Sequence, residues 1–502
     1  MQRDSMARTA GFIEVHGLWS GEQKRRAQQI KAQVKKDKLQ LFRIAWADPH
    51  GASRAKTVTL PAFLGALENG YNINVATTTL DASGARTFDS FTRGGGMGLD
   101  EMTGSPNLII VPDPATFRIL PWEPNVGWIL SDEYFISGKP FHFSPRHLLR
   151  NQLARLTKRR MQALVGLEVE WYLLRLAEDH LTAEHIGAPG AKGRTINTYP
   201  VEPGYSFHSE TNLDLMHRPL AAVADALEKL NLPLRSFENE WGPGQVECTF
   251  APRRALEAAD NLVLFRTATR QVCRRLGYLA TFMCRPGLKG FYSSGWHLHQ
   301  SLTNDKGGVN LFMPKSSGEV LSPVGKNYLG GLLKYALPST LLSNPTVNAY
   351  RRFRINSLAP DRVAWGFDNR GVMLRVLGGA GDKTTRIENR VGEPSANPYL
   401  YIASQIIAGL DGIDNKVDPG PADTDPYTSQ HPMLPKTLSD ALTLFEREPL
   451  FREQFGKTFV DYYVKIKRTE LQRYETYVKD HGIDSTSDAT TEWEQNEYFD
   501  FF

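Results

Sequence analysis

At residues 386–413 the chain contains the segment RIENRVGEPSANPYLYIASQIIAGLDGI, a charged strand pattern followed by an apolar helix pattern. On a strand, side chains alternate between faces, so Arg386, Glu388 and Arg390 would share one face. Such a row of cation, anion and cation is either a structural salt-bridge ladder or a metal ligand between two anion-binding clamps. The residues after Pro398 have a mainly helical pattern.

Two pairs of acids precede that segment. Glu168 and Glu170 lie in the run GLEVE between apolar flanks, so on a strand their carboxylates point to the same face. Buried carboxylates side by side repel each other unless a cation lies between them. Glu240 and Glu247 are separated by the turn WGPGQV, and Glu247 leads into a predicted strand. The alternative for both pairs is a solvated acidic surface.

His297 and His299 in GWHLHQSL also have the spacing that places both side chains on one strand face. Taken alone, they fit hydrogen-bonded core histidines as well as ligands; beside four acids, a metal ligand is favoured. Further positive charge comes from Arg352, Arg370, Arg375 and Lys383. Hard oxygen ligands with many guanidinium groups indicate Mg²⁺ or Mn²⁺ together with a polyphosphate. The sequence has no P-loop and no dinucleotide fingerprint.

The composition is typical of a folded, enzyme-sized protein. The chain has 502 residues, of which 41% are hydrophobic and 23% charged, and its length predicts roughly two to four domains. The formal net charge is only +4, so we expect no nucleic-acid partner. None of Cys248, Cys273 and Cys284 forms a CxxC pair, which excludes a zinc ribbon. Without a signal-peptide pattern or a long apolar run, we expect a cytoplasmic protein with no membrane partner.

The element pattern predicts an α+β protein with two domains. Residues 1–138 are expected to form a small unit with a helix at 22–36, a hairpin at 39–60 and a long Gly-rich loop at 86–103. Residues 139–502 are expected to contain strands at 163–175, 244–250 and 295–303 with helices between them. The acidic, aromatic stretch 485–502 is expected to be a frayed tail or a contact in an oligomer.

The order of these signals resembles the glutamine synthetase family, from about Leu39 to about Tyr474. The two acid pairs, the histidine pair, the Arg-rich stretch and the Arg-x-Glu-x-Arg row before Asn397-Pro398-Tyr399 recur in the family's order. The resemblance implies a small N-terminal β-grasp-like domain at 1–138. It also implies a catalytic domain at 139–502, with a curved antiparallel sheet flanked by helices and a helical C-terminal region.

The resemblance also implies ATP as co-substrate and two or more divalent cations, Mg²⁺ or Mn²⁺, in each active site. One cation, near the glutamate substrate, would be held by Glu170, Glu240 and Glu247. A second, near the nucleotide phosphates, would be held by Glu168, His297 and Glu388. The positions that bind ATP in the family are matched here by His299, Ser301, Arg375, Lys383 and Arg386.

The catalytic positions of the family are matched as well. Arg352 and Arg390 correspond to clamps for the glutamate carboxylate and the transferring phosphoryl group, and Arg370 to another cation beside the phosphates. Asp48 corresponds to the carboxylate that takes a proton from the attacking amine, and in the family it reaches into a neighbouring subunit's active site. This implies a homo-oligomer, usually two stacked hexameric rings. The implied chemistry is phosphorylation of the γ-carboxylate of glutamate, followed by attack of an amine on the acyl phosphate.

At the amine site the chain departs from the ammonium-using members. Those members have a Glu six residues after the Arg of a Tyr-x-Arg motif; here the motif is Tyr350-Arg351-Arg352 and the sixth residue is Leu358. Tyr292 stands where they have an Asn, close to the substrate-binding position Gly295. An apolar amine site leaves the desolvation of ammonium uncompensated and favours a neutral, hydrophobic amine.

We therefore expect a γ-glutamylamide synthetase acting on an aniline-type amine or an alkylamine. A polyamine ligase is one alternative. A second is true glutamine synthesis, with Asp361 or Asp368 replacing the missing Glu. A third is a family member without catalytic activity.

Overall fold

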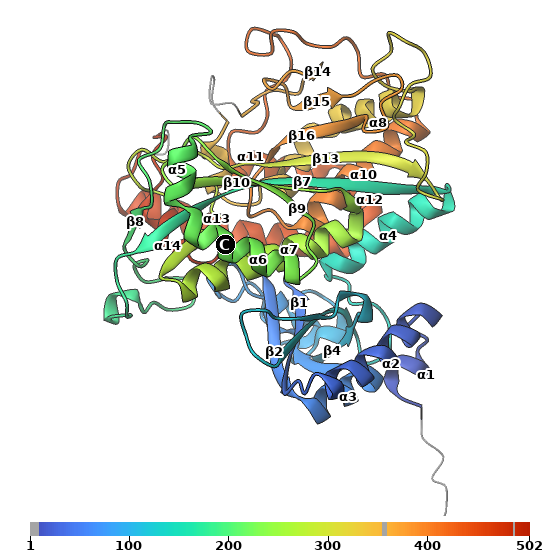
Figure 1. Ribbon diagram of the computed structural model, residues 1–502, viewed down its shortest axis with the longest axis vertical. Helices are drawn as coiled ribbons and strands as arrows, with labels where there is room; N and C mark the ends of the chain where they lie inside the picture. The colour runs from blue at the N-terminus through green and yellow to red at the C-terminus, as the bar shows by residue number, and fades with distance from the viewer. Residues whose placement is uncertain (1–9, 354–358, 485–486) are drawn as a thin grey trace, which may run out of the picture. The chain divides into compact units, whose positions relative to one another are not determined.

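The computed structural model describes residues 10–353, 359–484 and 487–502 (Figure 1). These residues divide into two compact units. Unit 1 contains the described residues of Met1–Asp48, Ser53–Thr78 and Phe88–His147. Unit 2 contains Pro49–Ala52, Thr79–Thr87 and the described residues of Leu148–Phe502. The final boundary, after His147, lies inside helix α4 (Pro145–Lys158), nine residues beyond the break expected at 138.

Unit 1 is built on a six-stranded sheet in the order β2-β1-β6-β4-β3, with β5 paired to β6. β1 and β6 run parallel, and the other neighbours run antiparallel. The predicted first helix and hairpin are confirmed, and the loop at 86–103 contains two short 3₁₀ turns. The elements are β1 (Leu41–Ala47), β2 (Ser53–Thr59), β3 (Tyr71–Asn74), β4 (Asn107–Pro112), β5 (Arg118–Ile119), β6 (Val126–Tyr134), α1 (Phe12–Val15), α2 (Gly21–Lys36) and α3 (Leu60–Asn69).

Unit 2 contains a ten-stranded sheet whose path is β14-β15-β16-β13-β7-β10-β9, visible across the upper part of Figure 1. The 16-residue strand β7 also pairs with β8, β11 and β12, so it is the hub of the sheet. All pairs are antiparallel except β14 with β15. The strands are β7 (Met161–Leu176), β8 (Thr198–Pro200), β9 (Leu234–Asn239), β10 (Gln245–Phe250), β11 (Arg253–Arg254), β12 (Tyr278–Thr281), β13 (Trp296–Asn304), β14 (Trp365–Phe367), β15 (Leu374–Leu377) and β16 (Arg386–Gly392).

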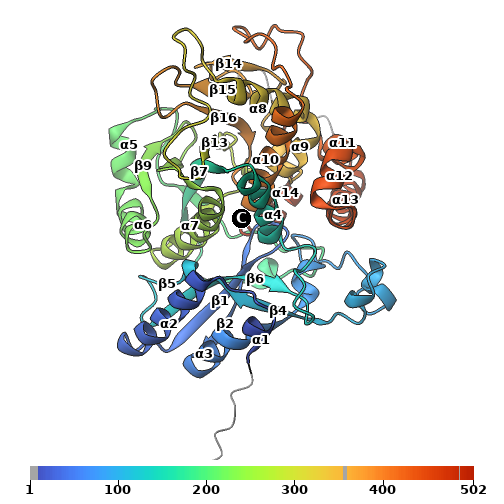
Figure 2. The ribbon, with the colours of Figure 1, turned by 90° about the vertical axis from the view of Figure 1, so that its right-hand side faces the viewer.

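Helices cover this sheet, as Figure 2 shows from the side, so the expected α+β class is confirmed. α7 packs on β7 and β12, and α10 contacts α7, α8 and α9. α10 is apolar nearly all round because it is buried. The helices are α5 (Glu210–Leu215), α6 (His217–Lys229), α7 (Ala255–Arg275), α8 (Pro323–Lys334), α9 (Ala336–Ser343), α10 (Pro398–Asp414), α11 (Leu438–Arg447), α12 (Pro449–Phe455), α13 (Lys457–Asp480) and α14 (Glu492–Tyr498). Among the helices that the structure describes, none combines the length and apolar character needed to span a bilayer.

The C-terminal segment corrects one sequence-based expectation. Within residues 487–502 the chain forms α14 and packs into unit 2, with Tyr498 and Phe499 buried. The Phe502 carbonyl accepts a hydrogen bond of 3.2 Å from the Phe282 amide. A frayed tail is therefore wrong for these residues, because apolar burial and backbone pairing hold the segment; residues 485–486 lie outside the described part.

Candidate active site

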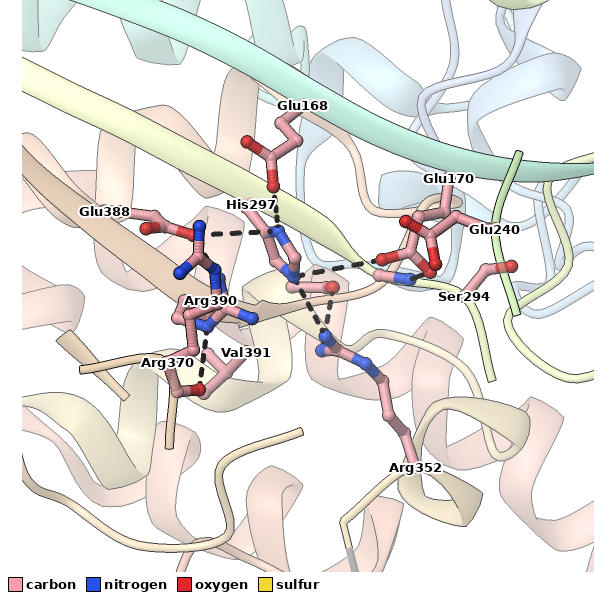
Figure 3. A network of polar contacts seen from close by, with 12 residues as sticks. Glu168, Glu170, Glu240, Ser294, His297, Arg352, Arg370, Glu388, Arg390 and Val391 are labelled. Carbon is pink, nitrogen blue, oxygen red and sulfur yellow. Dashed lines mark hydrogen bonds and ion pairs between the residues drawn. The ribbon is translucent and has the colours of Figure 1, made fainter. Parts of the chain in front are cut away.

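The register of β7 against its neighbours brings the predicted acids together. Glu170 lies opposite Glu247 on β10, and Glu168 lies opposite His297 on β13. Both Glu168 and Glu170 reach the same imidazole, with Oε1 of Glu168 at 2.5 Å from His297 Nδ1 and Oε1 of Glu170 at 4.0 Å from Nε2. The expectation that the two acids share one face is therefore confirmed (Figure 3).

The register continues across the sheet toward the cationic strands. His299 on β13 lies opposite Glu388 on β16, which lies opposite Arg375 on β15. On the other side His299 faces Gly166, where an added Cβ would come within 3.3 Å of the histidine's own Cβ. Gly166 thus leaves room for the imidazole in the row.

Glu168 is the acid shared by the two histidines. Its Oε2 lies 3.0 Å from His299 Nε2. Arg386 Nε donates to His299 Nδ1 at 3.1 Å, which leaves His299 Nε2 to donate to Glu168. Burial by itself would raise the pKa of Glu168, but attraction to His297 and hydrogen bonds from both histidines outweigh it and lower the pKa.

Glu388 is fully buried and bound by two guanidinium groups. Arg375 Nη1 donates to its Oε2 at 3.0 Å, and Arg390 Nη1 donates to its Oε1. Burial would raise the pKa of Glu388, but the charges of Arg390 and His297 prevail and lower it. Arg386, the other end of the predicted ladder, turns to His299 instead, so the ladder forms only in part.

The opposite end of the acid group is organised differently. Burial raises the pKa of Glu247 to about 11, and the negative charges of the neighbouring acids act in the same direction. Burial and the charge of Glu170 raise the pKa of Glu240 to about 8. Glu170 Oε2 accepts hydrogen bonds of 2.9 Å from Gln245 Nε2 and from the Gly295 amide. This end of the site needs protons or a cation to neutralise it.

Among the residues that the structure describes, two groups of side chains have the spacing of a metal site. One consists of Glu168, Glu247 and His297, and the other of Glu168, His299 and Glu388; in each, the ligand atoms lie within 4.8 Å of one another. The groups share Glu168 and divide the acids differently from the two sets implied by the resemblance. Mostly carboxylate oxygens with one imidazole fit Mg²⁺ or Mn²⁺ better than a thiolate-preferring ion.

Arg352 and Arg390 lie on the same side of the sheet as these acids (Figure 3). Arg352 is buried, donates to the Gly392 carbonyl at 3.2 Å and lies 3.5 Å from His297 Nε2. A Cβ at Gly295 would lie 2.4 Å from Arg352 Nη2, so glycine is required there for this guanidinium position. Arg390 Nε donates to the Arg370 carbonyl at 3.1 Å.

The segment before Arg352 is held by two acids that the sequence analysis did not single out. The Glu393 carboxylate accepts from the Thr346 amide and hydroxyl, both at 3.0 Å. The fully buried Glu494 carboxylate, from α14, accepts from Arg351 Nη2 at 3.0 Å and from Asn348 Nδ2 at 3.1 Å. Glu393 lies outside the alternating row of Arg386, Glu388 and Arg390, and Glu494 lies in the acidic, aromatic C-terminal stretch, so the strand pattern gave no signal for either contact.

The remaining predicted residues are less tightly gathered. Ser301 lies farther along β13, and Arg370 and Lys383 are exposed at turns before β15 and β16. Asp48 belongs to unit 1, where it is buried and forms an ion pair of 2.8 Å with Arg54. Leu358 lies outside the described residues.

The comparisons with known proteins agree with this fold. Residues 142–485 match the model of the catalytic domain of glutamine synthetase. The γ-glutamylanilide synthase of an Acinetobacter species is 42% identical over 98% of this chain and 99% of its own. The glutamate–isopropylamine ligase of a Pseudomonas species is 29% identical over 91% of this chain and 97% of its own. The solved structure of apo GmaS without ligand has a TM-score of 0.74 and 28% identity, covering 93% of this chain and 98% of its own.

The family match and the ligase relatives show that this fold is that of an ATP-dependent carboxylate–amine ligase. This chain belongs to the glutamine synthetase family.

Proposed function

We propose that this enzyme joins the γ-carboxylate of glutamate to a hydrophobic amine, an aniline or an alkylamine, through a γ-glutamyl phosphate. The observation that carries the choice of amine is the 42% identity, over nearly the whole of both chains, to a γ-glutamylanilide synthase. The presence of Leu358 where ammonium-using members have a Glu also favours a hydrophobic amine. An amine of low basicity needs no acidic partner to enter an apolar site.

ATP would be held by His299, Ser301, Arg375, Lys383 and Arg386 in this proposal, and two divalent cations, Mg²⁺ or Mn²⁺, by Glu168, Glu170, Glu240, Glu247, His297 and Glu388. When bound, the cations neutralise the charge that develops on the transferring phosphoryl group. The chain's own contribution is positional: Arg352 and Arg390 orient glutamate and phosphate, and Arg370 adds positive charge beside them.

The proposed reaction has two balanced steps. An oxygen of the γ-carboxylate takes the terminal phosphoryl group of ATP, and ADP leaves. The amine nitrogen then attacks the carbonyl carbon of this acyl phosphate, the bond from that carbon to the phosphate oxygen breaks, inorganic phosphate leaves and the nitrogen loses a proton. Asp48 is the proposed acceptor of that proton. In the proposed stacked-ring homo-oligomer, the Asp48 of one subunit would reach into the active site of a neighbouring subunit. Water must be excluded from the acyl phosphate, or it hydrolyses.

The test is phosphate release that depends on both ATP and glutamate, measured with ammonium, isopropylamine, aniline, a chloroaniline, putrescine and ethanolamine. We expect the highest kcat/KM with an aniline or with isopropylamine. A preference for ammonium or putrescine would contradict the proposal in favour of glutamine synthesis or polyamine ligation. Phosphate release with none of these amines would indicate either an amine outside this panel or a family member without activity.

Leu358→Glu provides a sharper test of the amine site. Because a carboxylate compensates the desolvation of a cation, we expect ammonium use to rise about tenfold relative to the native amine, about 1.4 kcal/mol. Leu358→Gln serves as the control, because a glutamine side chain has nearly the same shape as a glutamate side chain but no charge. An equal response of both variants would mean that charge at this position does not select the amine.

A further inference from the structure

Three half-exposed aromatic side chains gather at the acid-rich end of the site. Tyr205, Trp241 and Tyr292 are 49%, 41% and 46% exposed. The Tyr292 ring lies between the other two in an edge-to-face arrangement, with its centroid 6.1 Å from that of Tyr205 and 6.4 Å from that of Trp241. A group of large exposed apolar side chains is typical of a binding surface.

The cluster is continuous with the proposed catalytic residues. Trp241 follows Glu240 directly, and its amide donates to Glu240 Oε2 at 3.2 Å. On the other side, Tyr292 is two residues before Ser294, whose hydroxyl accepts from Gln245 Nε2 at 3.0 Å. The same Gln245 amide donates to Glu170. A molecule that contacts these rings is therefore adjacent to the acids of the site.

Hydrogen bonds hold the backbone from which these three rings project. The Tyr172 hydroxyl bonds to both the amide and the carbonyl of Tyr292, each at 2.9 Å. Tyr205 has a left-handed φ of 60°, which is unfavourable for an aromatic residue. Its amide donates to the Trp241 carbonyl at 2.8 Å, and its hydroxyl donates to the Gly290 carbonyl at 3.0 Å. The backbone that carries these rings is thus fixed, and so is the Tyr205 ring itself, which lowers the entropy cost of binding.

We propose that Tyr205, Trp241 and Tyr292 bind the aromatic ring of the amine substrate and so determine the preference for aryl over small alkyl amines. This assignment rests on the proposed function. Edge-to-face and offset contacts with these rings suit an aryl group, whereas a methyl group is too small to contact more than one of them. The amino group of the bound amine would then face the acid group, where the acyl phosphate is proposed to form.

The test uses Trp241→Ala and Tyr292→Ala in the full-length enzyme. Each is expected to raise KM for aniline about tenfold, while KM for methylamine and for glutamate changes less than twofold. The hydrogen bonds of Tyr292 to Tyr172 involve its backbone, so they survive the substitution. Tyr199→Ala, which removes a 61% exposed ring elsewhere, is the matched control and should leave all three constants unchanged.

Two further measurements keep this proposal separate from the proposed function. Calorimetric titration with aniline reads binding without turnover, and each variant should lose about tenfold in affinity. If the wild type prefers aniline and both variants keep that preference and affinity, the cluster assignment fails while the proposed function stands. If the wild type uses only ammonium and binds no aniline, both fail. If light scattering shows that the variants change oligomeric state with aniline binding intact, the cluster is a subunit contact and the proposal is overturned.

Discussion

The two ends of the acidic row in unit 2 are neutralised in different ways. At one end, Arg375 and Arg390 hold the buried Glu388 carboxylate, and its pKa falls below the usual range. At the other end, Glu240 and Glu247 face other acids, and their pKa values rise to about 8 and about 11. The same residue type is thus an ion in one place and an acid that retains its proton in the other.

The comparison shows where a cation is needed most. The negative charge of Glu388 is already neutralised by Arg375 and Arg390, so Glu388 does not need a bound ion for that purpose. At Glu240 and Glu247 the folded chain has no such balance, and a divalent ion would replace protons. His297 lies between the two ends and contacts Glu168, Glu170 and Glu388, so the ends are coupled through it.

The largest expected effect is the loss of activity in Glu388→Gln. Removing this charge leaves Arg375 and Arg390 without their shared anion and weakens the proposed metal group, so we expect turnover to fall at least about 10²-fold. Steady-state phosphate release is the measurement. Glu319→Gln, at an exposed pair with Lys326, is the control and should retain activity. A fully active Glu388→Gln enzyme would refute the metal assignment.

A second substitution acts on Gly295, two residues before His297 in the chain. In Gly295→Ala the new Cβ would meet the Arg352 guanidinium at 2.4 Å and displace it. Because Arg352 is the proposed clamp for glutamate, we expect KM for glutamate to rise about tenfold, with KM for ATP nearly unchanged. Gly308→Ala is a suitable control, because an added Cβ there meets nothing within 4 Å and the backbone of Gly308 is not left-handed. Equal changes in both KM values would mean that Arg352 does not act on glutamate alone.

Thermal melting of the metal-free protein should separate the two ends by sign. Glu388→Gln breaks buried ion pairs and should lower Tm by several degrees. Glu247→Gln removes a carboxyl group that burial and neighbouring acids make costly, so it should raise Tm by a few degrees. Saturating Mg²⁺ should reverse the second result, because the ion stabilises only the wild type strongly. If both variants melt below the wild type without metal, the inferred difference between the two ends of the site is wrong.

The smallest expected effect is the pH dependence of the rise in Tm that Glu247→Gln produces in the metal-free protein. Glu247 has a folded-state pKa raised from 4.5 to about 11, so its favourable contribution is present at acidic pH and is lost progressively as pH rises. In metal-free protein, the Tm advantage of Glu247→Gln should therefore grow between pH 6 and pH 8. Melting curves in matched buffers with a chelator measure it, and a gain independent of pH would contradict the raised pKa.

Much of the site could be predicted from local pattern. Strand alternation alone indicates that Glu168 and Glu170 share one face, and that His297 and His299 do so as well. The structure confirms both, because Glu168 contacts both histidines and Glu170 contacts His297. The pairing of Glu388 with Arg390 follows from the same alternation. The pairing of Arg375 with Glu388 and the contacts of Glu393 and Glu494 could not be predicted in this way, because the partners come from different elements of the chain.

The C-terminal segment shows the limit most clearly. Its acidic, aromatic composition predicts a frayed tail or a contact in an oligomer, yet Glu494 and Tyr498 are buried within the chain. Their side chains bond to Asn348 and Val347, which precede Arg352. Composition describes what water would favour for an isolated segment; it does not describe a segment that covers the core.

The sequence by itself determined the kinds of ligand, their spacing along each strand and the face that each side chain takes, because these depend on residue type and on the two-residue period of a strand. Only the tertiary structure decided which acids face cations and which face one another. That choice depends on the register of β7 against β10 and β13, strands distant in the chain, where a shift of one residue would turn every side chain to the opposite face.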